Sequence, residues 1–199
     1  MNRIAVYWAE FSHEIRAGLR GPLFTITAIG FTLYVMMLLT NADIMRGFGV
    51  MRNSAAVAYR FSTFMSIYLF FVWAWVFGQV VVRDRDVYLD ENVLCSPIRL
   101  HTLLFARYLG AGVVAFLLGA VVPLSLFLMP IPAWLGLVPQ ADIGAAPVLP
   151  VLMSLLLFVL PAALGMGALF VSSALWTRST AGPFAVAAAL MLIWMIGIV

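Results

Sequence analysis

The densest group of chemically active side chains in this sequence lies in VVVRDRDVYLDENVLCSPIRL, residues 80–100. Arginines and aspartates alternate over Arg83–Asp86, and Asp90 and Glu91 follow the apolar step Val87–Leu89. Charges at the rim of an interface set register and encounter rate, while a few apolar side chains fill a groove of the partner. The pattern is typical of a docking surface, for which the candidate residues are Arg83, Asp84, Arg85, Asp86, Val87, Tyr88, Leu89, Asp90, Glu91 and Arg99.

A solvated loop is the competing interpretation of this stretch. Runs of surface charge usually serve only solubility, so from charge alone the loop is the stronger interpretation. The acidic residues argue the other way, because Asp and Glu contribute little to membrane orientation and the neighbouring arginines would suffice for it. Residues 87–95 can form a short surface helix, and Ser96 and Pro97 can begin the next one.

Catalytic chemistry has little support elsewhere in the chain. The sequence contains no Lys and therefore no Gly-rich phosphate loop ending in Lys, so it cannot bind and hydrolyse ATP in that manner. No His-Glu-x-x-His motif occurs, His13 and His101 are far apart, and Cys95 is the only cysteine. We expect a protein that is not an enzyme, with no cofactor or metal of its own.

Composition identifies the elements that must position the charged stretch. The chain is 65% hydrophobic and 10% charged, against roughly 25% charged in soluble domains. Windows of about 20 apolar residues, the length that crosses a bilayer, occur five times. We therefore expect an all-α integral membrane protein with spans near residues 22–40, 61–82, 102–129, 147–176 and 181–199. Pro123 and Pro161 are candidate kinks.

The distribution of arginine predicts the topology. Arginines border the N-terminal end of the first span, both ends of the charged stretch and the link after the fourth span. Of the alternate connections, residues 41–60 carry Arg46, Arg52 and Arg60, and residues 130–146 contain none. The positive-inside rule places the N-terminus, Arg83–Arg107 and Arg178 in the cytoplasm. The net charge of +3 is too small and too dispersed for a nucleic-acid surface.

Residues 1–21 form a separate N-terminal arm before the transmembrane domain, residues 22–199. Trp8, Phe11, Ile15 and Leu19 recur at three- and four-residue spacing, and the charged residues fall elsewhere on the helical wheel. This predicts an amphipathic helix lying on the cytoplasmic membrane interface, ended by Gly21-Pro22. A plain membrane-surface anchor explains the pattern equally well.

The order of these features resembles the membrane subunit of type-2 ATP-binding-cassette exporters. The resemblance rests on the arm, the charged turn VVVRDRD after the second span, and SPIRLHTLLFARYLG before the third. NSAAVAYRFSTFMS and FARYLGA are closest to permease segments fused, in longer proteins, to a zinc aminopeptidase-like domain. The family implies six spans, so we expect the chain, whose apolar fifth window stops at Val199 without a polar flank, to be truncated at its C-terminal end.

The resemblance implies a function and its partners. Residues 87–95 would be a cytoplasmic coupling helix docking on a separate ATP-binding-cassette ATPase, which would carry the ATP and Mg. A second permease half, identical or different, and membrane lipid would be the other partners, and nucleic acid would not be one. The expected location is the bacterial inner membrane, with several spans and a cytoplasmic N-terminus.

Two other functions stay open. The chain could be a non-transporting membrane subunit of a larger complex, or the anchor of a catalytic domain beyond residue 199. No ionisable residue lies deep in any window, which disfavours a proton or ion path through the spans. The substrate is not specified by the sequence.

Overall fold

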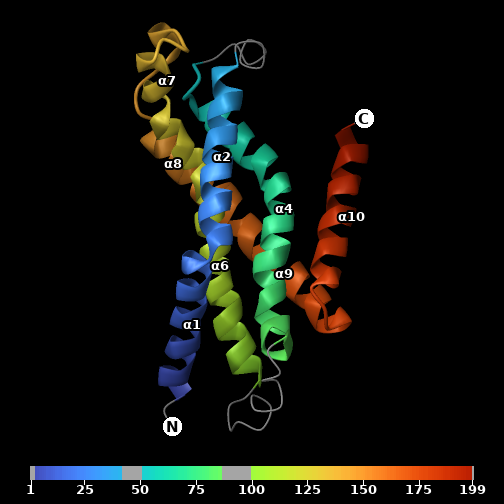
Figure 1. Ribbon diagram of the computed structural model, residues 1–199. Helices are drawn as coiled ribbons and strands as arrows, with labels where there is room; N and C mark the ends of the chain where they lie inside the picture. Colours follow the sequence, from blue (N-terminus) through green and yellow to red (C-terminus); the bar gives the residue numbers. More distant parts are fainter. Residues whose placement is uncertain (1–2, 42–50, 87–99, 199) are drawn as a thin grey trace. The chain divides into compact units, whose positions relative to one another are not determined.

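The structure is a computed structural model that describes residues 3–41, 51–86 and 100–198 (Figure 1). Every regular element within these ranges is a helix, as the apolar windows predict. The elements are α1 (Arg3–Arg20), α2 (Pro22–Thr40), α4 (Ala55–Asp86), α6 (Leu100–Leu124), the 3-10 turn η1 (Ser125–Leu128), α7 (Pro130–Trp134), the 3-10 turn η2 (Gln140–Asp142), α8 (Val148–Ser154), the π-helical segment η3 (Leu155–Val159), α9 (Leu160–Thr177) and α10 (Ala181–Ile198).

Four helical stretches are long and apolar enough to cross a membrane. They are Pro22–Thr40, Ala55–Arg83, His101–Trp134 and Val148–Thr177, with 19, 29, 34 and 30 residues. They correspond to the first four predicted windows, and the second begins earlier than predicted, at Ala55. The helix in the fifth window, α10, is also apolar but shorter, so its role as a span stays a prediction.

Both predicted kink positions coincide with a change of helix type. α6 ends one residue after Pro123 and passes into the 3-10 turn η1. The five residues Leu155–Val159, just before Pro161, are π-helical. A proline has no N–H for the carbonyl four residues earlier, and its ring crowds that carbonyl, so a locally wider or tighter turn accommodates it.

The chain divides into two compact units, which we describe separately. The first unit consists of Met1–Gly21, Tyr68–Ala115 and Ala162–Val199, and the second consists of Pro22–Ile67 and Phe116–Pro161. α4 and α6 therefore each contribute one part to each unit.

In the first unit, α4 and α6 run side by side in opposite directions (Figure 1). The indole N–H of Trp73 donates to the carbonyl oxygen of Ala115 at 3.0 Å, and the rings of Phe77 and Tyr108 lie 5.7 Å apart. α9 packs on this pair, because the Tyr108 hydroxyl donates to the Leu164 carbonyl oxygen at 2.7 Å. Both Trp73 and Phe77 are completely buried.

A glycine lets α9 approach α4 in this unit. A Cβ atom at Gly167 would lie 2.6 Å from Cε1 of Phe77, closer than a side chain tolerates. Small residues at helix contacts are the usual means of close packing within membranes, where there is no hydrophobic force between helices. Ala163, one turn earlier on α9, is fully buried as well.

The second unit has its own apolar core. α2 packs with the first turns of α4 and the end of α6, and the α6 end continues into η1. The core consists of Val35, Leu39, Val57, Ala58, Phe61, Met65, Val122, Leu126 and Met129. A buried hydrogen bond between the hydroxyls of Ser62 and Ser154 joins α4 to α8.

Candidate functional site

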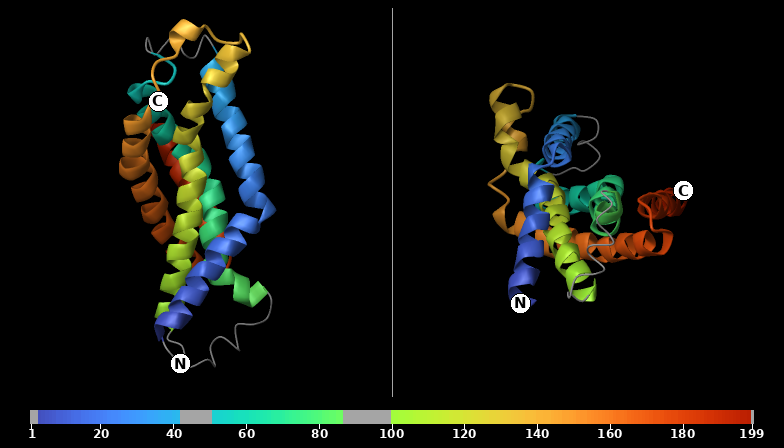
Figure 2. Two further views of the ribbon diagram at one scale, coloured as in Figure 1. Left: turned by 90° about the vertical axis from the view of Figure 1, so that its left-hand side faces the viewer. Right: turned by 60° about the horizontal axis from the view of Figure 1, so that its bottom comes forward.

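Two glutamates of α1 face the charged ends of α4 and α6. Glu10 and Glu14 are four residues apart and therefore lie on one face of α1. Within the first unit, α1 lies alongside the beginning of α6, as both views of Figure 2 show. The same face of α1 meets Arg83, in the last turn of the apolar part of α4, and Arg107, in the second turn of α6.

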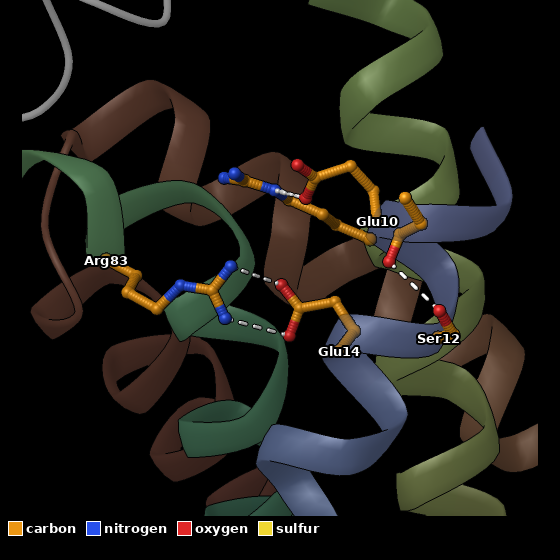
Figure 3. A network of polar contacts seen from close by, with 6 residues as sticks. Glu10, Ser12, Glu14 and Arg83 are labelled. Atoms are coloured by element: carbon orange, nitrogen blue, oxygen red, sulfur yellow. Dashed lines mark hydrogen bonds and ion pairs between the residues drawn. The ribbon is translucent and has the colours of Figure 1, made fainter. Parts of the chain in front are cut away.

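Glu14 and Arg83 form a two-pronged ion pair (Figure 3). Nη2 of Arg83 lies 2.8 Å from Oε1 of Glu14, and Nη1 donates to Oε2 at 3.1 Å. The side chain of Glu14 is only 10% exposed and that of Arg83 26%. The planar guanidinium thus meets both carboxylate oxygens, with one charge-assisted hydrogen bond and one close ion-pair contact, a geometry that Lys cannot provide.

Arg107 is paired with the second glutamate. Its Nε donates to Oε2 of Glu10 at 3.1 Å, and its side chain is 7% exposed, against 29% for Glu10. A charge so far removed from solvent requires a partner, because an unpaired buried ion is costly. The structure therefore gives Arg107 an acidic partner within the same chain.

The contact between α1 and α6 is close because glycines line it. A Cβ atom at Gly110 would lie 2.6 Å from Cβ of Glu14 and 3.0 Å from the carbonyl oxygen of Phe11. A Cβ at Gly18 would lie 2.6 Å from Cγ2 of Val114. Because residues later in α1 contact residues later in α6, the two helices run in the same direction.

This arrangement ties both borders of residues 87–99 to one helix. Arg83 precedes that segment, Arg107 follows it, and each binds a glutamate of α1. The cluster contains no nucleophile beside a base, and no group of His, Cys, Asp or Glu that could hold a metal occurs among the residues the structure describes. The cluster consists of paired opposite charges, an arrangement that suits a mechanical link between α1, α4 and α6.

The predicted docking residues fall mostly beyond the described ranges. Arg83 is described and paired, and Asp84, Arg85 and Asp86 form the last turn of α4. Val87, Tyr88, Leu89, Asp90, Glu91 and Arg99 lie outside the described residues, and so does the predicted coupling helix. The docking surface therefore stays a prediction.

The arm is helical, as its periodicity predicts, and the placement of its apolar stripe at a membrane interface stays a prediction. Trp8 is 59% exposed and Leu19 is exposed as well, whereas Phe11 and Ile15 are half-buried. The periodicity separates the charged residues from the apolar stripe, but it does not show which charged residues face another helix. The sequence signal for the face of α1 that packs on other helices is the four-residue spacing of Glu10, Glu14 and Gly18.

A second polar cluster joins two loops within the second unit, and sequence reasoning missed it. Arg52 donates from Nε to Oδ2 of Asp142 at 3.2 Å and from Nη1 to the carbonyl oxygen of Leu39. The Asn53 amide donates to the carbonyl oxygens of Gly144 and Ala145 at 2.9 and 3.1 Å and accepts from the Gly144 N–H at 2.8 Å. The residues are about 90 apart in sequence, so no local pattern could reveal the pairing.

Comparison with known proteins adds no assignment. No protein-family model matches the chain, and neither the curated proteins nor the solved structures include a match.

Proposed function

We propose that this chain is the transmembrane subunit of an ATP-binding-cassette exporter, in which ATP hydrolysis by a separate subunit drives a substrate across the membrane. The observation that carries the proposal is the pairing of Arg83 with Glu14 and of Arg107 with Glu10. These pairs connect the two borders of the charged stretch to α1, α4 and α6. A partner that displaced the stretch would therefore move three helices together.

The composition supports the same proposal. Four stretches have the length and apolarity of membrane spans, and the end of α4 carries a charged turn beyond its apolar part. A protein driven by an external ATPase needs no ionisable path through its spans. In this proposal residues 87–95 form the coupling helix, and two permease halves enclose the path.

The test is assembly with an ATPase. The chain is purified from its native membrane in mild detergent, and co-purifying proteins are identified by mass spectrometry. We expect a soluble protein with a Gly-rich phosphate loop, whose ATP hydrolysis rises when the chain is added. The variant Asp86→Arg/Glu91→Arg/Tyr88→Ala should reach the membrane in normal amounts but lose most of the ATPase.

A matched control separates docking from a general change of charge. Gln140 and Ala141 are exposed in η2, far along the chain from the charged stretch, so Gln140→Arg/Ala141→Arg adds positive charge elsewhere. This control should retain the ATPase. Retention of the ATPase, with unchanged stimulation, by the triple variant would refute docking through this stretch and favour a non-transporting membrane subunit.

A further inference from the structure

The outward face of α1 carries cations that the ion pairs leave uncompensated. Both acids of the helix, Glu10 and Glu14, face inward and are neutralised by Arg83 and Arg107. Arg16 and Arg20, four residues apart, are exposed on another face, with exposed His13 and Ala9 on the same stripe. Neither Arg16 nor Arg20 pairs with another residue among those described. The sequence of the arm mixes both signs of charge, but its folded surface does not.

The position of Arg20 along the chain places it at a membrane surface. α2 begins at Pro22 and has 19 residues, about 28 Å at 1.5 Å per residue. A bilayer hydrocarbon core is about 30 Å thick, so α2 must use its whole length to cross it. Arg20, two residues before α2, therefore lies at headgroup level, and Arg16 lies one turn before it on α1.

An exposed apolar side chain borders the cations at the α2 end of α1. Leu19, beside Arg20, is exposed on a neighbouring face of α1. A helix end with cations on one stripe and Leu on the adjoining stripe fits the boundary between headgroups and acyl chains.

We propose that the Arg16–Arg20 face of α1 binds the headgroups of anionic phospholipids. The occupant is argued from charge complementarity: an uncompensated cationic stripe at headgroup level, next to an apolar stripe. The inference requires α2 to cross the membrane but does not depend on transport or on an ATPase.

Two arginines should give a modest preference for anionic over neutral lipid. Each basic residue near an anionic membrane surface strengthens the attraction to anionic lipid by about fivefold. Because the arm is covalently joined to α2, it needs no independent membrane affinity. The stripe would therefore select which lipids surround the arm rather than recruit the protein.

The test measures lipid selectivity beside the stripe. Ala17 lies beside Arg16 and is exposed, so a fluorophore on Ala17→Cys in a Cys95→Ser background reports local lipid. The full chain is placed in phosphatidylcholine nanodiscs containing a small fraction of nitroxide-labelled lipid with either a phosphatidylglycerol or a phosphatidylcholine headgroup. We expect stronger quenching by the anionic lipid, and loss of most of that difference in Arg16→Gln/Arg20→Gln.

Four controls make the result specific. Arg16→Lys/Arg20→Lys should keep the preference, and Arg60→Gln/Arg178→Gln, which removes two charges elsewhere, should keep it too. A fluorophore on Ala141→Cys should show a smaller preference than one at Ala17. Inorganic phosphate should compete no better than chloride of equal ionic strength, since the occupant is a lipid and the attraction is screened by any salt.

Four results would overturn the proposal. They are equal quenching by both lipids in the parent, a preference that survives Arg16→Gln/Arg20→Gln, equal loss in the Arg60→Gln/Arg178→Gln control, and displacement by phosphate well beyond that by chloride. The last result would indicate a site for free phosphate. Equal quenching that appears only when a co-purified ATPase is present would indicate that the stripe faces a protein instead.

Discussion

Replacing Glu14 with Gln removes one charge from a two-pronged pair and leaves the Arg83 guanidinium without a carboxylate. Hydrogen bonds to charged groups contribute about 1.5–3 kcal/mol each when their partner is lost. Because the Arg83 side chain is 26% exposed, water offsets part of that loss. We expect Glu14→Gln to reduce the free energy of unfolding by about 1–2 kcal/mol.

A double-mutant cycle isolates this pair. Glu14→Gln, Arg83→Gln and the double variant are unfolded in the same detergent, and the double variant should lose clearly less than the sum of the two single losses. Ser12→Ala serves as a control on the same helix, because the Ser12 hydroxyl donates to the local carbonyl of Ala9. Additive losses would show that Glu14 and Arg83 do not stabilise one another.

Gly110 tests the packing beneath the same pair. The Cβ of Gly110→Ala would lie 2.6 Å from the Glu14 Cβ and 3.0 Å from a backbone oxygen, so α1 must shift away from α6. Overpacking of this kind costs about 1–3 kcal/mol. Gly165→Ala is the matched control, because its new Cβ would have open space for 4 Å around it and α9 should tolerate it. Thermal unfolding should separate the two variants, and equal unfolding temperatures would contradict the close contact.

At the scale of elements, the sequence predicts what depends on local pattern. The first span, Pro22–Thr40, agrees with its predicted window at both ends, because Gly21-Pro22 marks a boundary and apolarity continues without interruption to Thr40. Pro123 and Pro161 indicate where helix geometry changes. Local pattern does not specify which face of an amphipathic helix meets another helix, so the pairing of Glu10 and Glu14 with Arg107 and Arg83 could not be predicted.

The loop cluster of the second unit gives an element-scale prediction. Asn53 is buried and fixes residues 144–145 through three hydrogen bonds. Asn53→Ala leaves a backbone N–H and two carbonyl oxygens without these partners, at a cost of about 1–3 kcal/mol. We expect faster amide hydrogen exchange across residues 140–146. Gln140→Ala, at an exposed position in the same loop, should leave exchange there nearly unchanged, and an equally small effect of Asn53→Ala would contradict the anchoring role of its amide.

At the scale of the whole molecule, the distribution of arginine makes a prediction that the fold itself does not decide. Four stretches have the dimensions of membrane spans, but length and composition do not give their direction. The positive-inside rule predicts it, because eight of the 11 arginines lie at residues 3–20, at 83–107 and at Arg178, against three at residues 46–60 and none at residues 130–146. The same orientation puts Arg16 and Arg20 of the arm on the cytoplasmic leaflet.

Cysteine labelling in intact cells tests this orientation. In a Cys95→Ser background, Gln140→Cys should react with a membrane-impermeant maleimide added outside the inner membrane, because Gln140 is exposed and lies in the arginine-free connection. Ala9→Cys, exposed on α1, should react only after the cytoplasmic side is opened. The two sites serve as controls for one another, since both are exposed on the folded protein and differ in predicted side. The opposite pattern would invert the topology, and it would move the proposed docking segment and the lipid-binding face of α1 to the outer surface, where no cytoplasmic ATPase could reach them.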